Sequence, residues 1–563
     1  MLRRGLSVFT RPVLAGVLLL LCLLALSHFV NPQGALSTDS GAKVATLRVM
    51  DQRGTTSPDV GYWAEQYDPS GHLHPLYQTI RVGDRWINVT TLPMLLVAEP
   101  LYALGGYRAA LLVPMLGCIA VAYAARALAR RVGASDQRAW LAFWLVGLAS
   151  PVVIYSMDFW EHAIGLALMG WAAIVFLDVS ERRAGWRAAL IGGALLGAAS
   201  TMRTEALVYA LVFVGAAAIV QWRTGRLVDA ARVGAAALGA FVVVAGGELL
   251  VERQLFGEAF RFVRASGAAV ASVSGRGAAP IVPGSRVSDA LVTTFGLDGD
   301  ATVLAYLTGA ATVALIAYVA VRAKRGTREP VLGIAALVAL WALYLFRFHA
   351  GTGFVPGMFA ATPIAAVALA SGWASTANRW IRTVALVAVP LVWATMYVGG
   401  AAPQWAGRYL LVSGFLLLVC GIVALRDLER WAQGALIALT VSVTAFGYVW
   451  MVQRTDAFAK AGVAVMARPE PVIVSTFGHF GREVGSLYGD HRMLTALNDE
   501  QVHDAAGVVS AAGFDELGLL RLAEKPGTPG PTIDGWTEGE TTRLSFFPGQ
   551  DLEVITYHLN PSG

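Results

Sequence analysis

Long apolar runs alternate with short polar segments along the first four-fifths of the 563-residue chain. An α-helix needs about 20 apolar residues to cross a bilayer, and the runs have roughly this length. The run 86–104 is interrupted by Pro93, Glu99 and Pro100, so we expect it to lie in the membrane interface. The pattern predicts about thirteen membrane-spanning helices, at 13–30, 109–125, 139–155, 163–177, 188–202, 206–220, 233–250, 301–321, 331–346, 356–372, 383–398, 409–425 and 435–452.

The loops between these runs predict the orientation of the chain. The first run is long for a signal peptide and no small-x-small cleavage site follows it, so we expect a retained first helix. All the loops on the side of the N-terminus are basic, which predicts that this side is cytoplasmic and that the C-terminus lies outside the cell membrane. These basic loops are 126–138, 181–187, 223–232, 322–325, 379–382 and 426–430.

Beyond the last apolar run, the pattern changes to that of a small soluble unit. It predicts strands at 472–477, 492–497 and 552–559, helices at 481–488 and 499–512, and a loop at 526–531. The predicted fold class is an all-α polytopic membrane domain, residues 1–452, followed by a small extracytoplasmic α/β domain, residues 453–563. The first external loop, 31–108, is expected to carry short helices.

Composition agrees with a membrane protein and narrows the possible partners. Hydrophobic residues make up 56% of the chain and charged residues 14%, against about 25% charged residues in soluble proteins. No basic stripe interleaved with aromatic residues occurs in a soluble segment, so nucleic acid is not a predicted partner. Cys22, Cys118 and Cys420 all fall inside apolar runs, which leaves no disulfide framework and no cysteine metal site. No cofactor is predicted.

The first polar cluster follows the first span at once, in the stretch 37–43. Ser37 or Thr38 can cap a helix that starts there. Asp39 and Lys43, four residues apart, would share one face of that helix. The plain alternative is a surface ion pair, which contributes little energy. Ionisable residues at the edge of a membrane are often functional, so Asp39 is a candidate general base and Lys43 a candidate partner for an anion.

Two external turns between spans carry further polar residues. Asp158, Glu161 and His162 could shape a pocket and orient a sugar, or form a solvated turn within a belt of interfacial tryptophans. One histidine beside acids lacks zinc-site spacing, so a divalent metal receives little support. Arg203 and Glu205 would either close a hairpin by a local salt bridge or aim an arginine, held by the glutamate, at the site.

Late external turns supply the candidate phosphate-binding residues. Arg347 and His349 precede a glycine-rich segment whose backbone amides could cradle an anion, although a flexible turn explains the same pattern. Gln404, Trp405 and Arg408 form a second such turn. An arginine fork suits phosphate, and a tryptophan offers a flat face to a sugar or a prenyl chain. The alternative is an interfacial anchor.

Aromatic and polar residues also gather at 62–86 in the first external loop. Aromatic rings with polar edges suit carbohydrate, and they equally suit a lipid headgroup interface. The pattern leaves both interpretations open.

This arrangement resembles the GT-C superfamily of membrane glycosyltransferases, which includes the protein O-mannosyltransferases and the aminoarabinose transferases of lipid A. The resemblance covers the first four-fifths of the chain in layout and short stretches in sequence. It implies a catalytic acid just after the first span, matched by Asp39, and phosphate-binding basic residues in late external turns, matched by Arg347 and Arg408. It also implies a polyprenyl-phosphate-linked sugar as donor. The family often has two adjacent acids where this chain has Thr38-Asp39-Ser40.

The expected function is inverting transfer of a hexose or pentose to an extracytoplasmic acceptor: a cell-envelope glycan, a lipid or a protein. Asp39 would deprotonate the acceptor, and Arg408, with Arg347 or Lys43, would stabilise the leaving phosphate. A transporter of lipid or lipid-linked glycan is the alternative, but the spans are mostly free of charge apart from Glu248. A membrane anchor that displays the tail is a third possibility, for which about thirteen spans are excessive.

Overall fold

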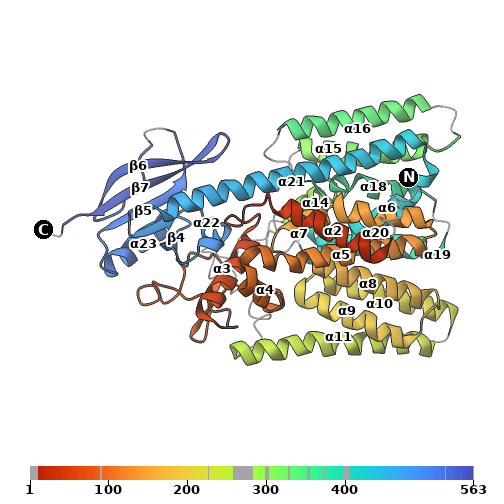
Figure 1. The fold of residues 1–563 in the computed structure, drawn as a ribbon, viewed down its shortest axis with the longest axis horizontal. Helices are drawn as coiled ribbons and strands as arrows, with labels where there is room; N and C mark the ends of the chain where they lie inside the picture. Colours follow the sequence, from red (N-terminus) through yellow and green to blue (C-terminus); the bar gives the residue numbers. More distant parts are fainter. Residues whose placement is uncertain are drawn as a thin grey trace.

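The computed structural model describes residues 11–561 without 89–91, 226, 258–282, 298–302, 327–329, 351–355, 373–374, 397–404 and 526–527. A bundle of helices carries a smaller domain with a sheet at one end (Figure 1). The helices of the bundle are α2 (Pro12–Ser27), α5 (Leu112–Arg131), α6 (Asp136–Leu148), α7 (Pro151–Met157), α8 (His162–Ser180), α9 (Trp186–Met202), α10 (Ala206–Thr224), α11 (Leu227–Phe256), α14 (Pro283–Phe295), α15 (Val303–Arg322), α16 (Pro330–Ala350), α17 (Met358–Ala361), α18 (Pro363–Ala370), α19 (Thr376–Met396), α20 (Leu411–Ala424) and α21 (Arg430–Met466).

Within the described ranges, seven of these helices are long and apolar enough to cross a membrane. An eighth span results if α6 and α7, bent by 45° where Ser150 caps α7 and Pro151 starts it, count as one. The chain is therefore a multi-pass membrane protein. The count of about thirteen spans is not confirmed: α2 has only 16 residues, and the predicted span 356–372 is divided between the short helices α17 and α18.

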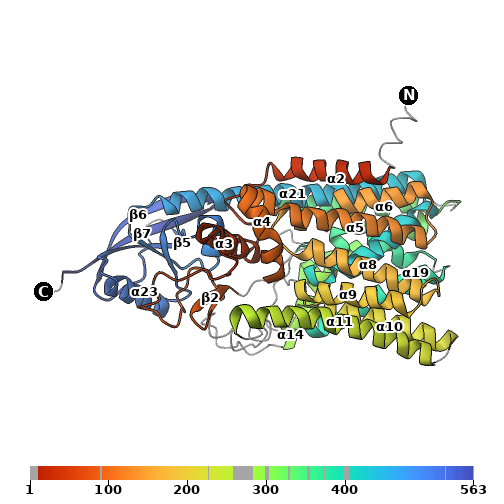
Figure 2. The same ribbon diagram turned by 60° about the horizontal axis from the view of Figure 1, so that its bottom comes forward.

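The first external loop folds against the small domain. It contains α3 (Thr38–Arg53), the hairpin of β1 (Thr79–Val82) and β2 (Arg85–Asn88), and α4 (Leu92–Ala110), which is kinked at Gly105 and Gly106. The predicted cap of α3 is confirmed, because the Ser37 hydroxyl accepts a hydrogen bond from the Ser40 amide. Figure 2 shows α3 and α4 between the bundle and the sheet.

The small domain is built on a five-stranded mixed sheet with strand order β4-β3-β5-β7-β6. The predicted strands and helices are present, the helix expected at 481–488 being split into α22 and a 3-10 turn, η4. Two strands, β5 and β6, were not predicted. The elements are β3 (Val472–Ser475), α22 (Phe480–Glu483), η4 (Gly485–Leu487), β4 (Arg492–Thr495), α23 (Asp499–Ala511), β5 (Glu516–Leu522), β6 (Trp536–Phe547) and β7 (Gln550–Leu559).

Three features attach the small domain firmly to the rest of the protein. Helix α21 runs without a break from the bundle past residue 452, and its last turns pack into the small domain through Phe458 and Val465. Tyr62 and Trp86 of the first external loop share one hydrophobic core with the sheet. Backbones also touch directly: a Cβ atom on Gly41 of α3 would lie 1.7 Å from the Arg482 carbonyl oxygen.

The contact at Gly41 generates a prediction. A Gly41→Ala substitution puts a methyl group into the space of a backbone carbonyl, so α22 must move away from α3. Overpacking of this kind typically costs roughly 1–3 kcal/mol. We expect a lower melting temperature by tryptophan fluorescence in nanodiscs, and faster proteolytic release of the small domain.

Gly507→Ala is the matched control. Gly507 lies in α23, and a Cβ atom there meets nothing within 4 Å. Replacing a helical glycine by alanine should leave stability unchanged or raise it by up to about 1 kcal/mol. A Gly41→Ala protein that melts and resists protease like the parent would contradict the close approach of α3 and α22.

Candidate active site

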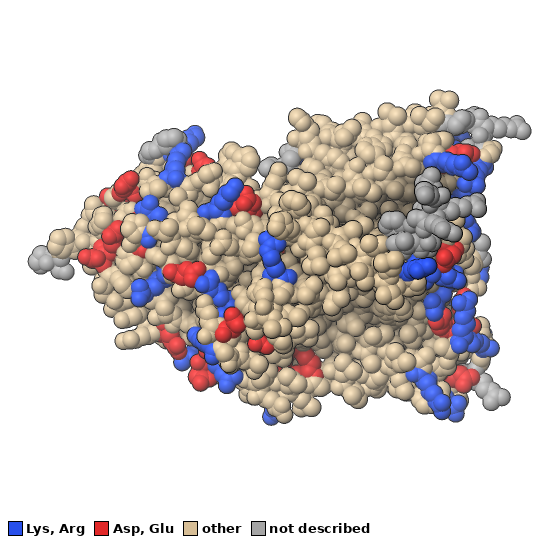
Figure 3. Space-filling view, viewed as in Figure 1, with Lys and Arg blue, Asp and Glu red and all other residues tan. Residues whose placement is uncertain are grey.

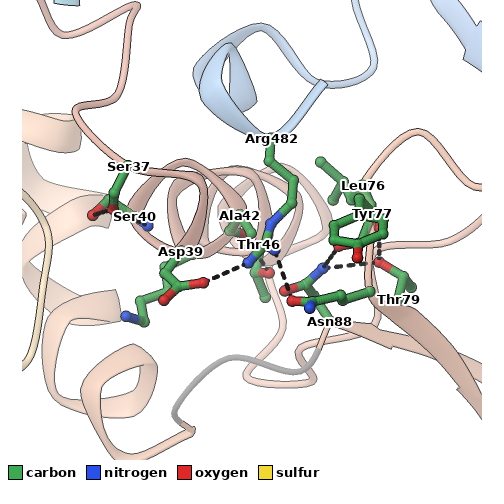
Figure 4. A network of polar contacts seen from close by, with 12 residues as sticks. Ser37, Asp39, Ser40, Ala42, Thr46, Leu76, Tyr77, Thr79, Asn88 and Arg482 are labelled. Carbon is green, nitrogen blue, oxygen red and sulfur yellow. Dashed lines mark hydrogen bonds and ion pairs between the residues drawn. The ribbon is translucent and has the colours of Figure 1, made fainter. Parts of the chain in front are cut away.

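The site is centred on Asp39, in the first turn of α3 at the junction of the bundle and the small domain. Arg482 of α22 donates from Nη2 to Asp39 Oδ1 at 2.9 Å. Arg408 Nη1 lies 3.6 Å from Asp39 Oδ2. Figure 4 shows Arg482 extending from α22 to Asp39. The Asp39 side chain is 36% exposed, so the carboxylate remains accessible although two guanidinium groups hold it.

Arg408 is positioned by two chain segments that meet beside α20. It begins the short 3-10 helix η2 (Arg408–Leu410), directly after Gly407, whose φ of 59° suits glycine. The Ala406 amide donates to the Pro356 carbonyl at 2.7 Å, which fixes the preceding turn. Arg408 also donates to the Tyr409 hydroxyl at 2.8 Å and lies over the Tyr409 ring. The guanidinium therefore has one defined orientation, toward Asp39.

Arg482 is fixed from the side of the small domain, and only 2% of its side chain is exposed. Its Nη1 donates to Gln78 Oε1 at 2.9 Å. The neighbouring Glu483 accepts a 2.6 Å hydrogen bond from Arg454 of α21, while its carbonyl accepts from the Ala35 amide. Three elements that are distant in sequence thus hold the short helix α22 in place.

The electrostatics keep Asp39 ionised. Burial alone would favour the neutral acid, but the charges of Arg482 and Arg408, with those of Lys43 and Arg203 farther away, hold the pKa of Asp39 well below its usual range. A general base works best when its pKa lies near the working pH. Asp39 can therefore take up a proton efficiently only when Arg408 and Arg482 move away from its carboxylate.

A buried chain of alternating charges lies beneath Asp39. Lys43 pairs with Glu161, Arg203 Nη1 lies 3.0 Å from Glu161 Oε1, and Arg203 Nε lies 2.9 Å from Glu205 Oε1. The alternative interpretation, a surface ion pair between Asp39 and Lys43, does not hold, because the Lys43 side chain is 1% exposed and pairs with Glu161. The predicted pair of Arg203 and Glu205 is present as one end of the chain.

The turn before α8 joins this chain to the cap of α3. Asp158 accepts hydrogen bonds from the hydroxyl groups of Ser40 and Ser37. Burial raises the pKa of Asp158 to about 6. His162 lies between aromatic rings, with centroids 4.5 Å from Tyr155 and 4.3 Å from Trp160. Asp158 and Glu161 therefore contact α3 one or more residues beyond Asp39, and the pocket-shaping roles of Asp158, Glu161 and His162 stay predictions.

The other residues predicted for the site are placed differently. Arg347 and His349 lie in the last turn of α16, where His349 is exposed. Gln404 and the glycine-rich turn 351–355 lie outside the described residues. Trp405 is buried in the bundle, with its ring against Gly447, so the sugar contact predicted for it stays a prediction. In the described part of the chain, no group of three or more His, Cys, Asp or Glu side chains could hold a metal ion.

The sequence interpretation did not identify Arg482. It is the only lysine or arginine between Arg468 and Arg492, in a segment rich in glycine and apolar residues. The adjacent Arg482 and Glu483 in such a segment were the available indication that these charged side chains are buried and paired in the fold.

No protein-family model matches the sequence, and no curated protein matches it. Solved structures match its fold. ArnT from Cupriavidus metallidurans bound to undecaprenyl phosphate is 13% identical, with a TM-score of 0.42 over 96% of this chain and 97% of that chain. The oligosaccharyltransferase AglB from Archaeoglobus fulgidus, in complex with an inhibitory peptide and a dolichol-phosphate, is 9% identical, with a TM-score of 0.41 over 90% of this chain and 69% of that chain.

The identities are under 25% and the TM-scores under 0.5. No argument about this chain rests on these likenesses, and no residue's role is carried over from either protein.

The buried charge chain generates a prediction. Glu161→Gln removes the carboxylate that faces both Lys43 and Arg203, and so leaves two buried cations with one acid. Removing one partner of a buried pair typically costs about 3–5 kcal/mol. We expect a loss of this order in the free energy of unfolding, measured by denaturation of the protein in detergent.

Asp178→Asn is the control, because Asp178 forms an ion pair with Arg131 at 2.6 Å with both side chains at least 20% exposed. Removing a partly exposed pair should cost at most about 1 kcal/mol. Equal losses of unfolding free energy in the two variants would show that burial does not determine how much these ion pairs stabilise the protein.

Glu483 generates a prediction of pH dependence. Burial, against the opposing charge of Arg454, raises the pKa of Glu483 from 4.5 to about 7. The folded protein then binds this proton more tightly than the unfolded chain does. The stabilisation is complete below about pH 4.5 and is lost as the pH rises to about 7. The melting temperature of the parent protein should therefore decline between these two pH values. Glu483→Gln should remove the part of this decline that is due to Glu483.

Glu470→Gln provides a control of opposite sign. Burial of Glu470 is outweighed by hydrogen bonds from Arg468 and Thr556, which lower the pKa of Glu470 below its usual 4.5. Its stabilisation is present above that pH and is lost on acidification. If Glu470→Gln and Glu483→Gln change the melting temperature over the same pH range, the raised pKa of Glu483 is contradicted.

Proposed function

We propose that this protein is an integral membrane glycosyltransferase that moves a sugar from a polyprenyl-phosphate donor to an extracytoplasmic acceptor, with inversion. The observation that carries the proposal is the accessible carboxylate of Asp39, held by Arg408 from the bundle and Arg482 from the small domain. Glycosyl transfer requires a base for the acceptor hydroxyl and cations for the departing phosphate, and this junction offers both.

In the proposed reaction, the acceptor oxygen forms a bond to the anomeric carbon while the bond from that carbon to the phosphate oxygen breaks. Asp39 takes the proton of the acceptor hydroxyl. The electron pair of the broken bond leaves with the polyprenyl phosphate, whose charge Arg408 and Arg482 stabilise. A single displacement inverts the anomeric configuration. The acceptor is a cell-envelope glycan, lipid or protein, and the sugar a hexose or pentose.

Lys43 and Arg203 act on the site through their electrostatic field and not by direct contact, because each is paired with an acid. Asp158, Glu161, His162 and Glu205 shape the inner wall of the pocket. Arg347, His349, Gln404 and Trp405 remain proposed contacts for the donor.

The distribution of charge supports the proposed placement in the cell membrane. Figure 3 shows lysine and arginine gathered at the end of the bundle remote from the small domain. Between this end and the small domain lies a band almost free of charged residues. Basic residues at the end of the bundle that carries the N-terminus suit a cytoplasmic N-terminus and about thirteen spans, with residues 453–563 outside. Donor and acceptor would then meet on the outer side, where polyprenyl-linked sugars are presented and nucleotide sugars are not.

A transporter of lipid or lipid-linked glycan is less well supported. Transporters place their charged residues near the midplane, in broken helices. The break between α6 and α7 carries Ser150 and Pro151, whereas Asp158 and Glu161 lie in the turn beyond α7. Charges at the junction with a soluble domain favour chemistry at the membrane surface.

Asp39→Asn tests the proposed function. The amide keeps the shape of the side chain but takes up no proton, and loss of a general base typically lowers the rate by about 10²–10⁴-fold. The measurement is transfer of label from a panel of polyprenyl-phosphate-linked hexoses and pentoses, in membranes that contain the protein. Asp51→Asn, an exposed position on the same helix α3, should retain the rate of the parent. Undiminished transfer by the Asp39→Asn protein would end the proposal.

A further inference from the structure

One residue of the first external loop has an unfavourable backbone conformation beside the site. Gln78 has a φ of 64°, in the left-handed region that glycine populates freely and residues with a Cβ atom rarely adopt. Of the described residues other than glycine, only Gln78, Arg182 and Ala406 have a positive φ. Ala406 lies two residues before Arg408, which faces Asp39. Such conformations persist where the surrounding structure enforces them, and they are frequent at functional sites.

The turn around Gln78 is closed by hydrogen bonds on both sides. The Thr79 amide donates to the Leu76 carbonyl at 3.1 Å, so Gln78 occupies the third position of a four-residue turn, where a positive φ normally selects glycine or asparagine. Asn88 Nδ2 donates to the Tyr77 carbonyl at 3.2 Å and to Thr79 Oγ1 at 3.0 Å. Asn88 and Thr79 are buried. The paired strands β1 and β2 therefore hold the turn in this conformation.

The Gln78 side chain contacts Arg482 from the side opposite Asp39. Gln78 Oε1 accepts from Arg482 Nη1 at 2.9 Å, while Arg482 Nη2 donates to Asp39 Oδ1 at 2.9 Å. Figure 4 shows Tyr77 and Thr79, the neighbours of Gln78, across Arg482 from Asp39. One terminal nitrogen of the planar guanidinium is thus held by the first external loop and the other by α3. The two contacts together define how the group is oriented.

We propose that Gln78 is a positioning residue, whose amide oxygen holds Arg482 in the orientation that directs its positive charge at Asp39. This role explains a glutamine in a turn that favours glycine, because glycine would relieve the backbone but supply no hydrogen-bond acceptor. The inference rests on the proposed function, in which Asp39 is the general base. It adds a residue of the first external loop to the site.

The neutrality of the amide sets the charge that Asp39 faces. A carboxylate at position 78 would also accept from Arg482, but it would compensate the guanidinium charge. An amide oxygen accepts the same hydrogen bond without adding a charge. Burial alone would raise the pKa of Asp39, and the largest opposing contribution comes from Arg482, followed by those of Arg408, Lys43 and Arg203. Fixing the orientation of Arg482 therefore fixes how firmly Asp39 stays ionised.

The test measures the protonation of Asp39 by chemical labelling instead of transfer. A water-soluble carbodiimide with an amine nucleophile modifies carboxyl groups in their protonated form, and mass spectrometry gives the rate at Asp39 in the full-length protein in nanodiscs. Gln78→Gly removes the acceptor and relieves the backbone. Loss of the acceptor should raise the pKa of Asp39, and with it the labelling rate at a fixed neutral pH, by roughly tenfold, the scale of one hydrogen bond to a charged group.

Gln78→Ala separates the side chain from the backbone. It removes the same acceptor but keeps a Cβ atom in the left-handed conformation. Gln78→Ala should therefore label at Asp39 as fast as Gln78→Gly and melt at a lower temperature. If one of these variants fails to fold, the other still decides the question.

Gln78→Glu tests the need for a neutral acceptor. The glutamate keeps an oxygen within reach of Arg482 and compensates its charge, so labelling at Asp39 should again be faster than in the parent. A residue that only closes the turn would leave labelling unchanged in this variant.

Gly83→Ala is the matched control. Gly83 has a φ of 64° in the turn between β1 and β2, at the opposite end of β1 from Gln78, and a Cβ atom there meets nothing within 4 Å. Alanine places strain in the same hairpin without removing a contact to Arg482. It should lower the melting temperature and leave labelling at Asp39 unchanged.

The outcomes separate this inference from the proposed function. Faster labelling in the three Gln78 variants, with parent-like labelling in Gly83→Ala, supports the positioning role. Parent-like labelling in Gln78→Gly and Gln78→Ala overturns it, as does parent-like or slower labelling in Gln78→Glu, or an equal rise in Gly83→Ala. Loss of transfer in Asp39→Asn, with parent-like labelling in the Gln78 variants, would keep the proposed function and end this inference. Faster labelling in the Gln78 variants of a protein whose parent transfers no sugar would do the reverse.

Discussion

The ion pair between Asp39 and Arg482 is the interaction on which the arrangement of the extramembrane part depends. A guanidinium that is 2% exposed is costly to bury unless its charge is matched, and Asp39 supplies the match across 443 residues of sequence. The pair requires α3 and α22 to lie at backbone contact distance, which glycines at 41 and 485 permit. It also requires a rigid attachment of the small domain, which the unbroken helix α21 provides.

Beneath this pair, the charge chain from Lys43 to Glu205 connects α3 to the ends of α8 and α10. Burying four charged groups is tolerated because each cation faces an acid within hydrogen-bonding reach. The chain has no excess charge of its own, so the field at Asp39 is set mainly by the two arginines at the open end. Burial and pairing therefore divide the cluster into a buried inner part and an outer part whose carboxylate is accessible.

The sequence predicted the features that depend on local pattern. Apolar periodicity located the helices, the polar stretch after the first span located α3, and the resemblance pointed to Asp39 and Arg408. It could not locate Arg482, because no local pattern records a pairing between residues 443 positions apart. The strand β6 was missed because most of its residues are polar and exposed. The predicted domain boundary at 452 falls inside α21, which continues to Met466, and it stays a prediction.

The origin of the two arginines bears on the role of the small domain. Arg408 belongs to the bundle and Arg482 to the small domain, so the site around Asp39 is complete only where the two are joined. A domain displayed on a passive anchor would need neither a buried arginine aimed at the bundle nor a core shared with the first external loop. In the proposed reaction, this position would let a water-borne acceptor meet a donor held in the lipid. The proposed reaction would therefore take place at the junction of the two domains, where a donor in the lipid and an acceptor in water would share one carboxylate.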